Sequence, residues 1–123
     1  MHYMLLIYGD EEAWESLMPE EQGKAMQGWT DYTQWLRDTG AYVGGDALAP
    51  TTAATTVRIR DGETLTTDGP FAETKEQLGG YYLIEAANLD DAIAAAAKCP
   101  GAFGGTMEVR PVVVFDEEGN PSE

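Results

Sequence analysis

The chain has 123 residues, of which 22 are acidic and 7 basic, so its formal net charge is −15. This length suits a single domain with its own core, and such acidity argues against direct binding to nucleic acid or to an anionic membrane. No apolar run approaches the ~18 residues that a membrane span needs, and no basic segment of a signal peptide opens the chain, so we predict a cytoplasmic protein.

The chain opens with a predicted strand over residues 2–8. Both faces of this strand are apolar, so we expect helices to cover one face and a second copy of the chain to cover the other. An acidic connector, residues 9–18, then leads to a helix that begins at Pro19 and ends near Thr39. Its apolar side chains recur at helical spacing and form one stripe, which consists of Ala25, Trp29, Tyr32 and Leu36.

The middle of the chain predicts a strand and a hairpin. Residues 41–48 contain the strand, in which Gly44-Gly45 indicates a bulge or a close approach of backbone or ligand. The pair Asp61-Gly62 is a strong signal for a two-residue hairpin turn, which would place Arg60 opposite Glu63. Few apolar side chains flank this turn, so we expect the hairpin to project from the body as a flap.

The last third predicts a strand, a helix and a final strand. Residues 81–86 are apolar on both faces apart from Glu85, and Asn88 can cap the helix that follows. The final strand covers residues 106–115, and Pro111 within it favours an edge position because proline donates no ladder hydrogen bond. We expect residues 116–123 to be an acidic disordered tail.

Without the hairpin, the order of elements is βαββαβ, the ferredoxin-like arrangement. We therefore predict an α+β fold in a single domain over residues 1–115, with an antiparallel sheet, the hairpin as an insertion and both helices on one side of the sheet. The other side of such a sheet is open, so we predict a homodimer.

Few residues in the chain could carry chemistry. His2 is the only histidine, so one chain cannot form a histidine-rich metal cluster, and we expect His2 to be an exposed residue at a strand end. Cys99 is the only cysteine, so there is no disulfide within the chain, and we expect a small buried side chain rather than a nucleophile. We predict no metal and no organic cofactor.

The stretch from Thr67 to Gly80 gathers ionisable side chains around a Gly-Pro turn. It is either a loop whose charges pair in solvent or the lining of a pocket, and its candidate side chains are Asp68, Phe71, Glu73, Lys75 and Glu76. A second polar cluster is Glu108 and Arg110, which lie on one face of the final strand. That pair is either a structural ion pair or an anchor for an acidic ligand group.

Three segments of the chain, read together, carry a family resemblance. They are MLLIYGD from Met4, DGPFAETKEQLGGYY from Asp68 and EVRPV from Glu108. Together they resemble the DGPF-domain branch of the YCII-related proteins, over Met1 to about Val114. The resemblance implies a dimeric α/β barrel, in which two ferredoxin-like subunits stack their sheets face to face.

For function, the resemblance implies two different roles. The wider family includes a dehalogenase-like enzyme, and several relatives carry a His-Asp pair, but Trp29 stands here where the histidine would fall. DGPF-type proteins also tend to be associated with extracytoplasmic-function sigma factors, which implies a regulatory accessory role.

We therefore carry two hypotheses forward. In the first, a homodimer binds a small polar or acidic metabolite and, if it transforms it, does so by acid–base chemistry with Asp68 or Glu73 as the base. Its ligand-binding residues would be Phe71, Lys75, Glu76 and Arg110. In the second, the protein is a non-catalytic partner of a sigma factor and its acidic surface meets a basic region of that protein.

Overall fold

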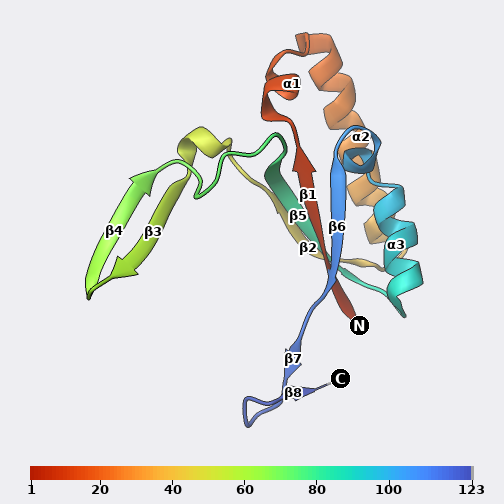
Figure 1. Ribbon diagram of the computed structural model, residues 1–123. Coiled ribbons are helices and arrows are strands. Elements are labelled where there is room, and N and C mark those ends of the chain that lie inside the picture. Colours follow the sequence, from red (N-terminus) through yellow and green to blue (C-terminus); the bar gives the residue numbers. More distant parts are fainter. Residues whose placement is uncertain (123) are drawn as a thin grey trace.

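The computed structural model describes residues 1–122, which form one sheet with helices on one side and a separate two-stranded arm (Figure 1). The sheet consists of four antiparallel strands in the order β2-β5-β1-β6. In chain order the main elements are β1 (His2–Gly9), α1 (Glu11–Glu15), α2 (Pro19–Asp38), β2 (Tyr42–Ala47), β3 (Thr55–Arg60), β4 (Glu63–Asp68), β5 (Gln77–Glu85), α3 (Leu89–Ala97) and β6 (Thr106–Pro111). Two short 3₁₀ turns, Thr51–Ala53 and Pro100–Phe103, and a small terminal hairpin of β7 (Val114–Phe115) with β8 (Pro121–Ser122) complete the fold.

The core lies between the sheet and the two long helices. On β1, Tyr3 and Leu5 point toward the helices and are almost completely buried. Leu36 of α2 and Ile84 of β5 meet them there and have no exposed surface. The hydroxyl of Tyr32 donates a hydrogen bond of 2.8 Å to the Ala95 carbonyl of α3, so the two helices are tied together as well as packed.

The long helix α2 begins and ends where its sequence predicts. Pro19 occupies its first turn, where a missing N–H costs nothing, and the Glu21 carboxylate accepts the Met18 N–H at 3.0 Å. Thr39 caps the other end, and Gly40 follows with a φ of +78°, the left-handed conformation that glycine adopts without strain.

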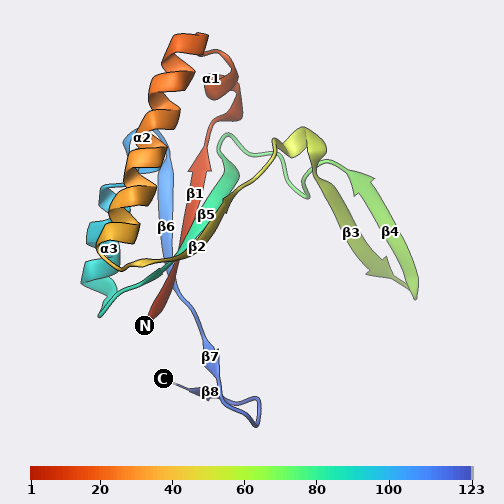
Figure 2. The same cartoon turned by 180° about the vertical axis from the view of Figure 1, so that it is seen from behind.

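The hairpin β3–β4, which we call the arm (residues 55–68), projects from the body (Figures 1 and 2). Its register pairs Arg60 with Glu63 and Arg58 with Leu65 around the Asp61-Gly62 turn, which confirms the predicted two-residue loop. In both views the arm extends to the side of the sheet away from α2 and α3. Every side chain of β4 is exposed.

Three local features differ from the sequence expectations. The connector over residues 9–18 contains the short helix α1, which Asp10 caps by accepting the backbone N–H groups of Glu12 and Ala13. The last strand stops at Pro111, where the ladder with β1 ends. The structure gives residues 116–122 a turn and a short strand, where the sequence predicts a disordered tail.

This architecture confirms the predicted α+β, ferredoxin-like fold with an inserted hairpin. β6 is an edge strand, as Pro111 indicates, and β1 lies in the middle of the sheet. Within residues 1–122 no helix is long and apolar enough to cross a membrane.

Candidate functional site

The face of the sheet opposite the helices is uncovered in a single chain, and we call it the open face. Residues that pair directly across antiparallel strands share a face, so the register identifies its members. Met4 pairs with Leu83 of β5, and Leu6 pairs with Tyr81. Met4, Leu6 and Leu83 are half-buried, and they form an apolar floor at the centre of the open face.

A tyrosine–aspartate pair lies on one side of this floor. The Tyr81 hydroxyl donates a hydrogen bond of 2.6 Å to the Asp46 carboxylate of β2, and the two residues are direct cross-strand partners. This hydrogen bond, together with the negative charge of Asp46, raises the pKa of Tyr81 above its ordinary value of 10.0. The one O–H bond of Tyr81 is directed at Asp46, so toward a ligand the Tyr81 oxygen offers lone pairs that accept a hydrogen bond.

A glutamate–arginine pair lies on the other side of the floor. Arg110 of β6 pairs with Met4, and Glu108 pairs with Leu6. The Arg110 Nε atom lies 3.6 Å from the Glu108 carboxylate. Both side chains keep about half or more of their surface exposed. The Arg110 guanidinium therefore retains N–H groups that could donate hydrogen bonds to a carboxylate, enolate or phosphate of a ligand.

The upper end of the open face is closed by the start of β5. The Thr106 hydroxyl donates a hydrogen bond of 2.7 Å to the Glu76 carboxylate, and Gln77 accepts the Glu11 N–H at 3.0 Å. Thr106 pairs with Tyr8, whereas Arg110 pairs with Met4 at the other end of β6. Glu76 and Arg110 therefore lie on the same face but at its opposite ends.

The remaining predicted site residues do not gather in a single chain. Asp68 ends β4 and is exposed. Phe71, with 80% of its surface exposed, and Glu73 and Lys75 lie in the loop that returns from the arm to β5. No ion pair links Glu73 with Lys75 within the described residues. Of the six predicted residues, the structure thus brings only Glu76 and Arg110 to the open face.

Sequence reasoning missed Asp46 and Tyr81. The signal for Tyr81 was present, since a residue two places before Leu83 in a strand shares its face. The sequence does not predict the face of Asp46, because the register of β2 against β5 shifts between Tyr42 and Gly44. The register shift at Gly44 and the tight contact of Gly45 with β5, described below, confirm what the double glycine predicts.

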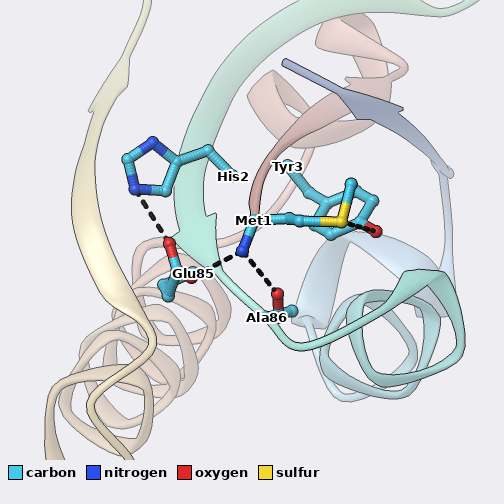
Figure 3. A network of polar contacts seen from close by, with 5 residues as sticks. All are labelled: Met1, His2, Tyr3, Glu85 and Ala86. Carbon is cyan, nitrogen blue, oxygen red and sulfur yellow. Dashed lines mark hydrogen bonds and ion pairs between the residues drawn. The ribbon is translucent and has the colours of Figure 1, made fainter. Parts of the chain in front are cut away.

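A second polar network lies at the lower end of the sheet, around Glu85 (Figure 3). One Glu85 oxygen accepts a hydrogen bond of 2.6 Å from the amino group of Met1, and the other lies 2.9 Å from Nε2 of His2. The bond from the amino group holds the pKa of Glu85 below its ordinary value. His2 is thus a partly exposed strand-end residue, as predicted, with a structural partner.

Three further features concern the only cysteine, the outer surface of α2 and possible metal ligands. Cys99 has no exposed surface, and burial raises the pKa of its thiol to about 11, which fits the predicted inert residue. A shallow hollow of about 340 Å³ runs along α2, lined by Met26, Trp29, Thr30, Thr33, Gln34 and Arg37. Residues 1–122 contain no group of three His, Cys, Asp or Glu side chains placed to hold a metal ion.

Comparison with known proteins identifies the family. The family model described as the YCII-related domain matches residues 1–116. The chain belongs to the YCII-related family. This confirms the resemblance carried by the three segments of the sequence.

Two proteins are similar to this YCII-related chain over nearly its whole length. The uncharacterized protein R00369 of Rhizobium meliloti (strain 1021) is 40% identical over 124 residues, which cover 99% of this chain and 100% of that one. The structure is also similar to 5-chloro-2-hydroxyhydroquinone dehydrochlorinase (TftG) of Burkholderia phenoliruptrix AC1100, solved in complex with 2,5-dihydroxybenzoquinone. That match has a TM-score of 0.54 at 10% identity and covers 98% of this chain and 100% of the other. At this identity the likeness shows a shared fold.

Proposed function

We propose that this YCII-related protein is a homodimer that binds a small acidic molecule on the open face of its sheet. One observation carries the proposal, namely the apolar floor of Met4, Leu6 and Leu83 with polar pairs on both sides. Ligand sites in proteins combine an apolar lining with a few convergent polar groups. Here the polar groups are Arg110, which carries a positive charge, and the hydroxyl of Tyr81.

The second copy is needed because a site of this kind must be enclosed. On a single chain the floor is only half-buried, and a ligand lying on it would remain open to water. A second sheet stacked on the first would exclude water and strengthen the contacts with Arg110 and Tyr81. An antiparallel sheet with one face on the core commonly leaves the other to solvent, but an apolar centre on that other face favours cover.

The ligand of the structural neighbour supports the choice of an acidic molecule. 2,5-Dihydroxybenzoquinone, which is bound in the TftG complex, has readily ionised hydroxyl groups and a flat ring. Such a ring could lie on the floor of Met4, Leu6 and Leu83 while an ionised oxygen accepts from Arg110 and a remaining hydroxyl donates to the Tyr81 oxygen. This fit favours small planar or carboxylic acids as the class of ligand.

If the protein transforms its ligand, acid–base chemistry is the class that the residues support. Tyr81 holds its proton toward Asp46 and its raised pKa makes it a weak acid, so this pair could exchange a proton with a ligand only after their hydrogen bond opens. Asp68 and Glu73 stay predictions as bases, and Phe71 and Lys75 stay predictions as ligand contacts. All four are exposed in one chain, so they could act only where a second subunit encloses them.

The regulatory alternative also stays a prediction. The net charge of −15 is the feature that favours a basic partner protein such as a sigma factor. A purified sigma factor retained at low salt and released at high salt would support it.

Binding of small acids by titration calorimetry tests the proposal. The probes are 2,5-dihydroxybenzoquinone, benzoate and malonate, and the variants are Arg110→Gln and Tyr81→Phe. Arg37→Gln is the control, because Arg37 lies on the helix side, over the Tyr42 ring. We expect saturable binding of at least one probe, weakened about tenfold or more by Arg110→Gln because a charge-assisted hydrogen bond is lost, and unchanged in the control. Absence of saturable binding for all three probes would contradict the proposal.

A further inference from the structure

The arm carries two arginines, of which only Arg60 has an acidic cross-strand partner, Glu63, although the chain as a whole is strongly acidic. Arg58 and Arg60 account for two of its seven basic side chains. Both are exposed, and neither takes part in any ion pair among residues 1–122. Among residues 1–122, the one hydrogen bond that either arginine side chain makes runs from Arg60 to the neighbouring Ile59 carbonyl, at 3.3 Å.

These arginines line a hollow on one face of the arm. The register places Arg58 beside Leu65 and Arg60 beside Glu63. The hollow measures about 330 Å³, and Pro70 at the base of the arm closes it, with Thr56 and Thr67 completing the wall. Leu65, with the two arginine cations beside it, could bind a protein surface on which acidic side chains surround an apolar one.

The arm also lacks the cover that a two-stranded ribbon needs. An isolated hairpin is marginally stable in water, yet Val57 and Ile59 each keep 59% of their surface exposed and Leu65 keeps 45%. At the base of the arm, the Gly69 N–H donates to the Ala54 carbonyl at 2.7 Å and joins its two ends. Next to this base, Glu11 accepts hydrogen bonds from Thr51 and ties the turn before the arm to the body. The body of the same chain therefore leaves its length unsupported.

We infer that the arm of each subunit clasps a second copy of this chain, with the face of Arg58, Arg60 and Leu65 seated on an acidic surface of that copy. Three observations favour a second copy as the occupant. A second copy of the chain has a net charge of −15, which is opposite in sign to the charges of Arg58 and Arg60. The arm extends on the side of the open face (Figures 1 and 2), where the proposed second sheet would lie. Its six-residue strands reach about 20 Å, far enough to pass the edge of a stacked sheet.

This inference rests on the homodimer of the proposed function, and it adds a contact that sheet stacking alone does not require. In a two-fold dimer each arm would make the same contact, so one substitution in the arm changes two contacts in the dimer. The contact would be electrostatic in part, and therefore weaker at high salt.

Sedimentation velocity of variants tests the clasp. Arg58→Ala/Arg60→Ala removes two positive charges from the arm, and Lys24→Glu, on the exposed surface of α2, changes the net charge by the same amount. We expect the arm variant to raise the dissociation constant of the dimer about tenfold and to lose most of its salt dependence. We expect Lys24→Glu to leave the constant within about threefold of the unchanged chain.

A photo-crosslinking residue at Leu65 gives a second readout that does not depend on affinity. The clasp predicts a crosslinked product with twice the mass of the chain, and its loss when Arg58→Ala/Arg60→Ala is added. An unchanged dissociation constant together with crosslinks only within one chain would overturn the clasp and leave the homodimer standing. A monomer at every concentration tested would overturn both.

Discussion

Tyr81 and Asp46 form a side-chain link between the two strands that build one side of the open face. The hydroxyl-to-carboxylate distance is 2.6 Å, and the side chains meet without burial in the core. A pair on an open face contributes little to stability because solvent competes for both groups. The hydrogen bond instead holds the Tyr81 side chain in one orientation, as the polar groups of a ligand site require.

The pKa of Tyr81 tests this link directly. Asp46→Asn removes the carboxylate charge and leaves only a weaker, neutral amide acceptor, so we expect the pKa of Tyr81 to fall toward the ordinary 10.0 of tyrosine. NMR titration of ring-labelled tyrosine measures it, and Asp31→Asn on the exposed face of α2 serves as the control. An unchanged titration of Tyr81 in Asp46→Asn would show that the pair does not form.

Cys99 gives a second prediction for a single residue. Burial raises the pKa of its thiol from 9.0 to about 11, which lowers the thiolate fraction at neutral pH about hundredfold. We expect the folded protein to react with iodoacetamide more slowly than the unfolded chain by at least that factor. Mass spectrometry of timed samples follows the reaction, and equal rates in both states would contradict the buried position.

Single residues differ in how far the sequence alone defines their place. The burial of Leu36 and Cys99 follows from the sequence, because an apolar side chain at helical spacing or beside a helix end usually packs in the core. Asp46 was not predictable, because its face depends on a register shift that only the pairing of β2 with β5 reveals. Arg110 was placed correctly on its strand face, since alternation in a strand needs no tertiary information.

Among the elements, β2 depends most strongly on a glycine. A Cβ atom at Gly45 would lie 2.7 Å from the Tyr81 carbonyl oxygen and 2.9 Å from the Tyr82 ring. Neither contact can be relieved by a flexible side-chain end, so β2 would have to move away from β5. The neighbouring Gly44 has no atom within 4 Å of the same added carbon.

This difference gives a matched pair of variants. We expect Gly45→Ala to lower the free energy of unfolding by about 1–3 kcal/mol, because overpacking forces backbone shifts. We expect Gly44→Ala to change it by less than about 0.5 kcal/mol. Urea unfolding followed by tryptophan fluorescence, at one protein concentration for all chains, measures both, and equal effects would contradict the close approach of β2 to β5.

The elements also show what local sequence can and cannot define. The arm was predicted with its register because Asp61-Gly62 forces a two-residue turn, and the turn sets every pair along both strands. The stop of β6 at Pro111 was predicted only as an edge position, since loss of one N–H does not say where a ladder ends. The helix α1 was missed because its five residues are too few for a periodic pattern to appear.

At the scale of the whole molecule, one chain leaves three apolar features uncovered. These are the floor of the open face, the arm, and the segment from Val112 to Phe115, each side chain of which keeps at least 36% of its surface exposed. Exposed apolar surface on this scale marks an interaction site in a protein that remains soluble. The open face and the arm lie on the side of the sheet away from α2 and α3, and β7 extends below the end of the sheet, so these helices cover none of the three (Figures 1 and 2). The whole-molecule account therefore depends on a second copy.

The mass of the protein in solution tests this most directly. Sedimentation equilibrium at micromolar concentration should give twice the 13.3 kDa of one chain, and the value should stay at two chains at low and moderate salt. A mass of a single chain throughout that range would contradict the enclosed site, and the clasp with it.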